Sequence, residues 1–249
     1  NMIIIKNERE IEAMKEACRI SAGALKLAGE AVEPGVTTAE IDKLAYDYIK
    51  SQGAEPNFLG YGGFPGTACI SINDEVIHGI PGHRKIKNGD IVSIDLGAKI
   101  GGYNGDNAAT FAAGDVSKEA KRLMEATEQS LYEGIKKAVA GNRIGDISYA
   151  VQQYVEARGY SVVREYVGHG VGASLHEEPE VPNFGRPSHG PRLIPGMTLA
   201  IEPMVNFGEP EVRVLKDKWT VVTRDGSLSA HFEHSVLITS DGPVILTQP

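Results

Sequence analysis

The sequence is poor in cysteine, with only Cys18 and Cys69 among its 249 residues. Two thiols are too few for a disulfide framework or for a structural zinc site built from cysteines, and they favour a reducing, cytoplasmic setting. Apolar runs of transmembrane length are also missing, and the apolar part of the opening NMIIIKNERE is too short for a signal peptide. We therefore expect a soluble intracellular protein in which Met2 is the natural start and Asn1 is an added residue.

Positive charge is in deficit as well. Lys and Arg number 25 against 33 Asp and Glu, which gives a formal net charge of −8 and a sequence pI near 5.4. This balance argues against nucleic acid or an anionic membrane surface as the main partner. The hydrophobic content of 41% is ordinary for a globular protein, and the chain is long enough to bury a sizeable core.

The first elements that the sequence predicts are two helices. Asn7 with Glu10, and Thr37 with Glu40, have the spacing of a capping box, and apolar residues at helical spacing follow each pair. We expect a long first helix that ends before the first Pro-Gly pair and a second helix that ends by Gly53. Short strand-like runs divided by glycine and proline come next.

A second group of helices and strands follows. Ser117 opens an apolar helical pattern that runs to Ile135, and a shorter helix is expected to stop at Gly159. The strand-like runs after it lie at 160–163, 198–205, 220–222 and 231–239.

Helix, helix and strands therefore occur twice in the same order, with a seam near Gly114, although no residue-level repeat relates the halves. We predict one α+β domain over residues 2–249 whose strands share a sheet covered by helices. Its two related halves would span about 7–113 and about 114–249. A site built from both halves would lie where they meet.

The stretch from 90 to 111 predicts a β-hairpin that carries two acids. Apolar and polar residues alternate along its first arm, and Gly101 and Gly102 separate that arm from the second. Strand pairing is expected to bring Asp95 and Asp106 face to face on one side of the sheet, where two like charges would repel. The alternative is that both are turn or edge residues that face water.

Three more polar side chains stand in apolar or glycine-rich contexts. His169 lies between glycines in GHGVG, while Glu202 in TLAIEPMV and Glu233 in HFEHSVLIT interrupt apolar strands. A carboxylate in such a strand needs a partner, because burying an unpaired one costs several kcal/mol. The alternative for either glutamate is a buried ion pair with Arg213 or Lys218. A lone histidine is more often a packed or solvated side chain than a ligand.

Taken together, Asp95, Asp106, His169, Glu202 and Glu233 would gather about four negative charges if they converge. Two divalent cations neutralise such a cluster better than arginine does. Oxygen-rich ligation with one nitrogen suits Mn, Fe, Co or Zn in a catalytic role. Two neighbouring ions of this kind acidify a bound water and polarise a carbonyl, which indicates hydrolysis.

Ordered motifs carry a more specific signal. They are HGIP at 78–81, the hairpin with its two acids, GHGVG followed by His176 and Glu177, AIEPM at 200–204, and WTVVTRDGSLSAHFEH at 219–234. With these motifs the chain resembles the type I methionine aminopeptidases of the bacterial short form, in peptidase family M24. The resemblance covers nearly the whole chain. It implies the pita-bread fold, in which two pseudo-symmetric halves share a curved antiparallel sheet covered by helices.

The resemblance also implies roles for individual residues. The five residues of the acidic cluster would be the ligands of two metal ions, with Asp106 and Glu233 bridging the pair. Glu202 would also be the proton shuttle for the attacking water. His78 would contact the substrate near the scissile bond, and His176 would hydrogen-bond the scissile carbonyl and stabilise the developing oxyanion. The alternative for His78 is an ordinary turn histidine.

A methionine side chain needs a narrow apolar pocket. The resemblance assigns to this pocket Tyr61, Phe64, Cys69 and Trp219, together with Phe58, Leu175 and Met204. For each of them alone, ordinary core packing is the alternative. Two positions depart from the family pattern, because Leu175 stands where phenylalanine is frequent and Ile77 where cysteine is frequent. The selectivity of the pocket is therefore less fixed than the metal site.

The sequence thus predicts a cytoplasmic metallo-aminopeptidase that uses a hydroxide activated by two metal ions. By resemblance, it removes the initiator methionine from nascent chains and methionyl peptides when the second residue is small. The expected metals are Co, Mn, Fe or Zn, and Asn73 and Ser229 match positions that help hold a monovalent cation in relatives. We expect a monomer with transient ribosome contact, no membrane and no nucleic-acid substrate.

Two alternatives stay open at this point. A proline-directed peptidase of the same family, such as prolidase or aminopeptidase P, shares the ligand set. A non-catalytic binding protein on the same fold is a hypothesis of another class, because fold alone does not fix function.

Overall fold

Capping boxes start the first two helices where the sequence predicts them. In the computed structural model, which describes residues 2–249 and leaves Asn1 outside, helix α1 spans Glu8–Glu30 and α2 spans Thr38–Ser51. The Asn7 side chain accepts the Glu10 N–H and the Glu10 carboxylate accepts the Asn7 N–H; Thr37 and Glu40 repeat the arrangement. These bonds satisfy N–H groups that a helix start leaves unpaired.

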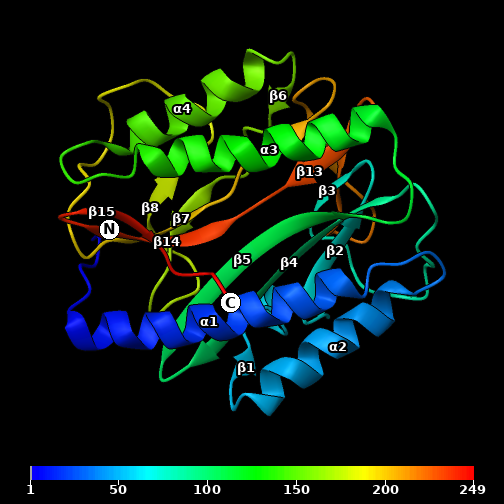
Figure 1. Ribbon diagram of the computed structural model, residues 1–249, viewed down its shortest axis with the longest axis horizontal. Helices are drawn as coiled ribbons and strands as arrows, with labels where there is room; N and C mark the ends of the chain where they lie inside the picture. The colour runs from blue at the N-terminus through cyan, green and yellow to red at the C-terminus, as the bar shows by residue number, and fades with distance from the viewer. Residues whose placement is uncertain (1) are drawn as a thin grey trace.

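The predicted hairpin is the central element of the first half. Strand β4, Ile91–Ile100, pairs along its whole length with β5, Tyr103–Ala112. Gly101 and Gly102 connect them with φ values of 60° and 83°, as a two-residue hairpin turn requires. Strands β1, Glu55–Pro56, and β2, Ala68–Ile72, pair with β4. Helix α1 packs against β4 and β5 and against α2 (Figure 1).

The second half repeats helices and strands. Helix α3, Lys118–Lys136, begins at the N-cap Ser117 and packs against α4, Ile144–Glu156. A five-stranded antiparallel sheet has the order β15-β14-β9-β7-β8. Its members are β7 Gly168–Gly170, β8 Glu177–Val181, β9 Thr198–Ile201, β14 His234–Thr239 and β15 Gly242–Ile245.

Two smaller sheets complete the layer of strands. One contains β6 Ser161–Val162, β10 Met204–Asn206 and β13 Ser229–His231. The other contains β3 Glu75–Ile77, β11 Val212–Val214 and β12 Val221–Thr223. A short 3₁₀ turn at Tyr61–Gly63 precedes β2.

Two predicted strands are interrupted, which the sequence pattern did not indicate. The run 198–205 is divided into β9 and β10 around Glu202 and Pro203, and the run 231–239 into β13 and β14 around Phe232 and Glu233. The breaks lie opposite each other, because Ile201 pairs with His234 before them and Met204 with His231 after them. Proline cannot donate a ladder hydrogen bond, and this limits pairing at the first break.

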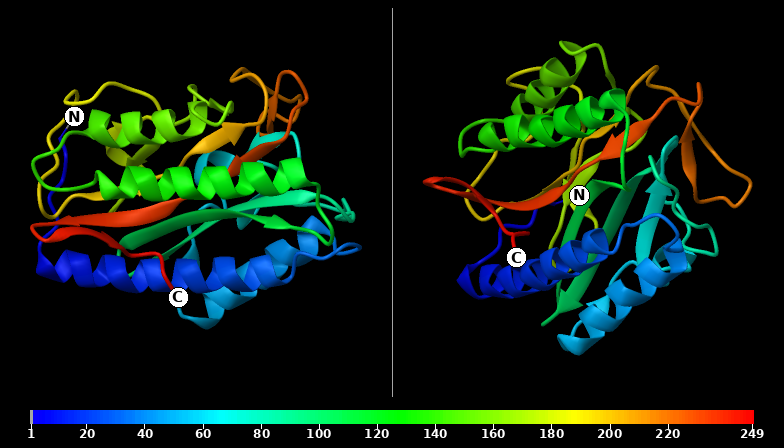
Figure 2. Two further views of the ribbon diagram at one scale, coloured as in Figure 1. Left: turned by 45° about the horizontal axis from the view of Figure 1, so that its top comes forward. Right: turned by 45° about the vertical axis from the view of Figure 1, so that its right-hand side comes forward.

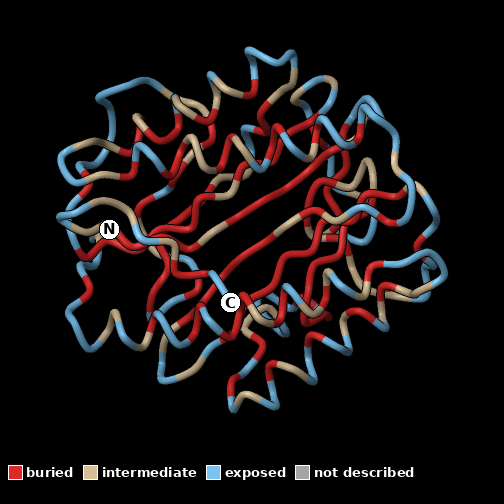
Figure 3. Tube along the Cα trace, viewed as in Figure 1, coloured by how far each residue is buried: buried red, intermediate tan, exposed pale blue. Residues whose placement is uncertain are grey.

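The two groups of helices and strands meet along β5 and β13. Thr110 Oγ1 donates to the backbone carbonyl of His231 and accepts its N–H, both at 2.9 Å, and Ala108 forms a bridge with Glu233. The short sheets continue one another in a curved layer between α1 and α2 on one side and α3 and α4 on the other (Figure 2). Buried residues concentrate in this layer and on the helix faces toward it (Figure 3). The predicted α+β class is confirmed, while the division at 113/114 stays a prediction.

Within residues 2–249, no helix has the length and apolarity needed to cross a membrane.

Candidate metal centre and substrate pocket

Asp95 on β4 and Asp106 on β5 lie on one face of the hairpin. Asp95 is opposite Ala108 and Asp106 is opposite Gly97, so the two acids are diagonal neighbours and not directly face to face as predicted. Asp95 is 9% exposed and Asp106 is 2% exposed. The alternative in which both acids face water is therefore wrong.

The other three predicted ligands come from the second half. Glu202 and Glu233 occupy the two strand breaks, and His169 is the middle residue of β7. Strand β7 lies between β8 and β9, and a Cβ at Gly168 or Gly170 would collide with carbonyl oxygens of those strands. The glycines around His169 therefore allow the close strand approach that holds the imidazole in place.

These side chains gather into two adjoining groups that could each hold a metal ion. Oxygen and nitrogen atoms of Asp106, His169 and Glu233 form one group, and those of Asp95, Glu202, His231 and Glu233 form the other, all within 4.8 Å in each group. Glu233 belongs to both groups, as a bridging ligand would. Bridging by Asp106 stays a prediction.

Lysine and arginine do not neutralise this cluster. Arg213 and Lys218 are exposed. Among the residues that the structure describes, the ion-pair partners of Glu202 and Glu233 are histidines: His231 at 3.5 Å and His169 at 4.0 Å. The alternative of a buried ion pair with Arg213 or Lys218 is therefore wrong.

Buried polar atoms in the cluster lack hydrogen-bond partners, and this observation tests whether metal ions fit. Asp95 Oδ1, Asp106 Oδ1, both Glu233 carboxylate oxygens and His231 Nε2 are buried with no partner within the described chain. Buried polar atoms in folded proteins are almost always satisfied. Carboxylate oxygens and an imidazole nitrogen are the donors that Mn, Fe, Co and Zn accept. The residues present therefore fit divalent ions.

The acids also disfavour one another's charge. Burial and the nearby Asp106 raise the pKa of Asp95 well above its usual range. Burial, with Asp106 and Glu202 close by, does the same to the pKa of Glu233. Like charges held together out of water need a counter-charge to remain ionised. Cations bound at this position would supply it.

The imidazoles in the cluster favour the charged form of a carboxylate. Burial opposes ionisation of Glu202, but His231 and the neighbouring Glu233 lower its pKa to about 2. Burial also opposes the charged form of His169, while Asp106, 3.3 Å from its Nε2, and Glu202 raise the pKa of His169 to about 9.

His78 and His176 border the cluster without joining it. His176 Nδ1 is 2.9 Å from the Tyr61 hydroxyl, and its ring centroid lies 4.1 Å from that of His169. The ring of His78 stands edge-on to Tyr166 and Trp219. Burial lowers the pKa of His78 to about 4, and burial with His169 nearby lowers that of His176. Both are neutral near pH 7, so each can donate one hydrogen bond.

A cavity of about 180 Å³ adjoins the cluster. The predicted Tyr61, Phe64, Cys69 and Trp219 all line it, and the rings of Phe64 and Trp219 meet edge to face with centroids 5.2 Å apart. The other lining residues include Phe58, Ile77, His78, Leu175, His176 and Met204. The cavity is thus lined by aromatic and apolar side chains together with acids and imidazoles.

Three residues of the site were missed from the sequence. Tyr166 and Val167 line the cavity, and His231 reaches the metal-ligand cluster. The one signal for His231 was its place in HFEH, two residues before the predicted ligand Glu233. Tyr166 and Val167 precede the GHG stretch, and no pattern marked them.

Comparison with known proteins gives a consistent result. A model of metallopeptidase family M24 matches residues 12–240. The methionine aminopeptidase of Clostridium acetobutylicum is 56% identical, with 99% of each chain covered. Methionine aminopeptidase 1 of Bacillus subtilis is 54% identical, with 99% of this chain and all of that protein covered.

Solved structures separate the two enzymatic hypotheses. The structure of methionine aminopeptidase from Thermotoga maritima matches with a TM-score of 0.98 and 46% identity, and 100% of each chain is covered. The prolidase of Pyrococcus horikoshii matches with a TM-score of 0.77 and 26% identity, and only 64% of its chain is covered.

Proposed function

The chain belongs to metallopeptidase family M24, and we propose that Asp95, Asp106, His169, Glu202 and Glu233 hold two divalent metal ions at the junction of its halves. Its function is that of a methionine aminopeptidase, because relatives 54% and 56% identical over almost the whole length carry this activity. The predicted pita-bread fold is confirmed by the full-length match to a methionine aminopeptidase structure. The observation that carries the metal proposal is the set of buried donor atoms without partners.

The metal ions, when bound, supply a Lewis acid and an activated water at neutral pH. The chain positions the substrate and moves protons. Glu202 accepts the proton that the attacking water loses. Its lowered pKa means that it is present as the carboxylate at neutral pH. His176 donates a hydrogen bond to the scissile carbonyl oxygen, and Tyr61 holds its Nδ1 side at 2.9 Å. His78, which lines the same cavity, contacts the substrate.

The substrate class follows from the cavity beside the acids. An unbranched thioether side chain fits a narrow space walled by Phe64, Cys69 and Trp219, where sulfur–aromatic contacts are favourable. We propose that the free α-amino group lies at the acidic end and that the second residue of the peptide must be small. Leu175 and Ile77, the two departures from the family pattern, both line this cavity, so we propose that they affect its selectivity.

The alternatives are less well supported. The proline-directed prolidase is less similar in sequence and structure than the methionine aminopeptidases, and a third of its chain has no counterpart here. Mutual repulsion between buried acids lowers the stability of the chain. A non-catalytic binding protein would gain nothing that offsets this loss.

Further properties are proposals of the same kind. We keep Co, Mn, Fe or Zn as the metals, and a monovalent cation beside Asn73 and Ser229, whose N–H donates to the Asn73 carbonyl at 3.0 Å. Nascent chains as natural substrates, transient ribosome contact, a monomeric state and a cytoplasmic setting rest on the family resemblance. The two buried free thiols are compatible with a reducing compartment.

An aminopeptidase assay tests this function. Metal-free protein is titrated separately with Mn²⁺, Fe²⁺, Co²⁺ and Zn²⁺ and given Met-Ala-Ser or Met-Lys-Ser. We expect release of methionine from Met-Ala-Ser only after metal addition, and little release from Met-Lys-Ser. Equal turnover of the two peptides would contradict the size rule. Hydrolysis of an Xaa-Pro dipeptide in place of Met-Ala-Ser would support the proline-directed alternative.

A further inference from the structure

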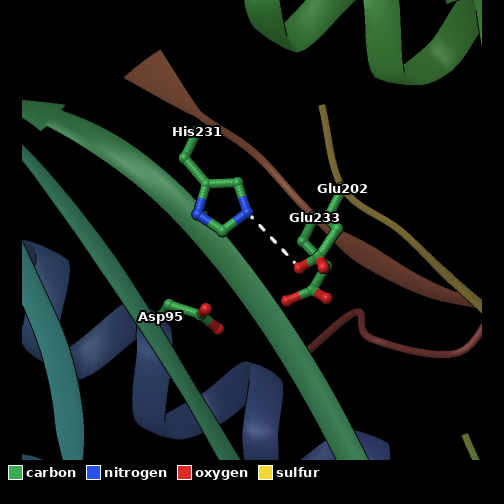
Figure 4. Close-up of side chains that lie close together, drawn as sticks. All are labelled: Asp95, Glu202, His231 and Glu233. Carbon is green, nitrogen blue, oxygen red and sulfur yellow. Dashed lines mark ion pairs between the residues drawn. The ribbon is translucent and has the colours of Figure 1, made fainter. Parts of the chain in front are cut away.

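His231 is a buried imidazole aimed at the proposed metal centre. It ends β13, directly before the strand break that contains Glu233, and is 1% exposed. Its Nε2 groups with carboxylate oxygens of Asp95, Glu202 and Glu233 within 4.8 Å. Figure 4 shows the ring pointing toward the two glutamates, while Asp95 approaches from β4.

Among the described residues, the ion-pair partner of the His231 ring is Glu202. Its Nε2 is buried and forms no hydrogen bond within residues 2–249. The backbone of His231 is held separately, because its N–H and carbonyl both bond to Thr110 Oγ1 at 2.9 Å. The strand would therefore be fixed here with a different side chain. A buried ring nitrogen left unsatisfied is costly unless something binds it.

The distance from His231 to Glu202 distinguishes a direct hydrogen bond between them from two ligands of a shared ion. Nε2 lies 3.5 Å from Glu202 Oε2, which is longer than the usual N–H···O hydrogen bond of about 2.9 Å. Two ligand atoms that are each about 2.1 Å from one tetrahedral ion stand about 3.4 Å apart. The separation matches two ligands of a shared ion better than a direct hydrogen bond.

The other group provides an internal comparison. His169 Nε2 is 3.3 Å from Asp106 Oδ2, and these two residues are both predicted ligands. Each group thus contains one imidazole nitrogen and a carboxylate oxygen at almost the same separation. One imidazole, His169, comes from β7 and the other, His231, comes from β13.

We propose that His231 is a sixth metal ligand and gives the ion at Asp95, Glu202 and Glu233 a nitrogen donor. This inference rests on the proposed metal pair and extends its ligand set. The two groups of donors would then be Asp106, His169 and Glu233, and Asp95, Glu202, His231 and Glu233, with Asp106 still predicted to bridge the pair. Because imidazole favours Zn, Fe and Co over Mn, the second ion gains selectivity that an all-oxygen site would lack.

Direct metal–nitrogen coupling tests the proposal. The chain is labelled with ¹⁵N-histidine and loaded with two equivalents of ¹¹³Cd²⁺, a diamagnetic probe that accepts oxygen and nitrogen ligands. Scalar coupling between ¹¹³Cd and ¹⁵N requires a bond between the two atoms. We expect two coupled imidazoles in the native chain, those of His169 and His231. His231→Gln keeps a polar side chain of similar reach and should leave one.

His234→Gln is the matched control. His234 is also partly buried and lies three residues further along, but its ring contacts the Thr247 hydroxyl at 2.7 Å and belongs to neither ligand group. This variant should retain both couplings. In a chelator competition, His231→Gln should bind its second Zn²⁺ about 10-fold or more weakly, with a smaller loss for Mn²⁺.

The outcomes also separate this inference from the proposed function. Coupling at His169 alone, in a native chain that hydrolyses Met-Ala-Ser, would overturn the role of His231 and leave the five-ligand metal pair intact. Coupling at no histidine, together with hydrolysis that does not depend on metal, would overturn the metal pair and the inference with it.

Discussion

His78 is a half-buried side chain, neutral at pH 7, whose contribution to the free energy of unfolding depends on pH. Burial lowers its folded-state pKa from 6.5 to about 4. Between these values the unfolded chain binds a proton at His78 that the folded chain does not, so the free energy of unfolding falls as pH drops from 6.5 to 4. At about 1.4 kcal/mol per pKa unit, this loss amounts to about 3 kcal/mol at pH 4. It is absent at pH 7 and above.

His78→Asn should remove this pH dependence. The backbone at His78 has a φ of 62°, a left-handed conformation that asparagine tolerates well. Urea unfolding of metal-free native chain and variant at pH 7 and pH 4 measures the difference. On acidification, the free energy of unfolding of the native chain should fall by about 3 kcal/mol more than that of the variant. Other titrating groups are the same in both chains, so the difference reports on His78. Equal losses would show that His78 is not held neutral by burial.

Single residues were predictable from the sequence where chemistry restricts the choice. A carboxylate in an apolar run needs a partner, and this requirement drew attention to Glu202 and Glu233, although it left a buried ion pair open for each. His231 escaped the prediction because one histidine near a ligand is not informative until the fold shows where its ring points. The diagonal placement of Asp95 and Asp106 depends on strand register, which the hairpin sequence constrains only through its turn.

At the scale of elements, a buried ion pair fixes the N-terminal segment to the start of β8, next to His176. Lys6 contacts the Glu177 carboxylate, and their side chains are only 2% and 8% exposed. The Lys6 N–H also donates to the Gly196 carbonyl at 2.9 Å. A Cβ at Gly172 would collide with both partners, so the pair is tightly enclosed. Each of the two enclosed charges is therefore neutralised by the other.

Lys6→Met should lower the free energy of unfolding by about 3–5 kcal/mol, because Glu177 then remains buried without its counter-charge. Lys15→Met is the matched control: it removes the same charge from the exposed i,i+3 pair with Glu12 and should cost at most about 1 kcal/mol. Urea unfolding at pH 7 measures both. Similar small losses in the two variants would mean that water reaches Glu177.

Helices were more predictable than strands because their signals are local. The capping residues Asn7, Thr37 and Ser117 fixed helix starts from side-chain chemistry within one turn. The breaks at Glu202 and Glu233 instead depend on two strands changing partners at the same level. Such pairing joins residues far apart in sequence, and a run of apolar residues looks the same whether or not its partner changes.

At the scale of the molecule, the proposed metal centre draws its residues from segments far apart in the sequence. Asp95 and Asp106 come from the hairpin β4–β5, while the other proposed ligands follow residue 160. Ions that bind this junction bind only the folded chain, so they stabilise it by mass action. In their absence the same acids repel one another across the junction, as the raised pKa of Asp95 and Glu233 indicates.

Metal removal should therefore lower thermal stability. At an ion concentration about 100 times the Kd, binding contributes about 2.7 kcal/mol, which corresponds to a Tm shift of about 5–10 °C for a chain of this size. Excess chelator should lower the Tm of the native chain by that amount. In Glu233→Gln the shift should be much smaller, because this variant loses the ligand common to both groups and one of the repelling charges. Its metal-free Tm should exceed that of the metal-free native chain, and a lower value would show that the acids do not repel one another across the junction.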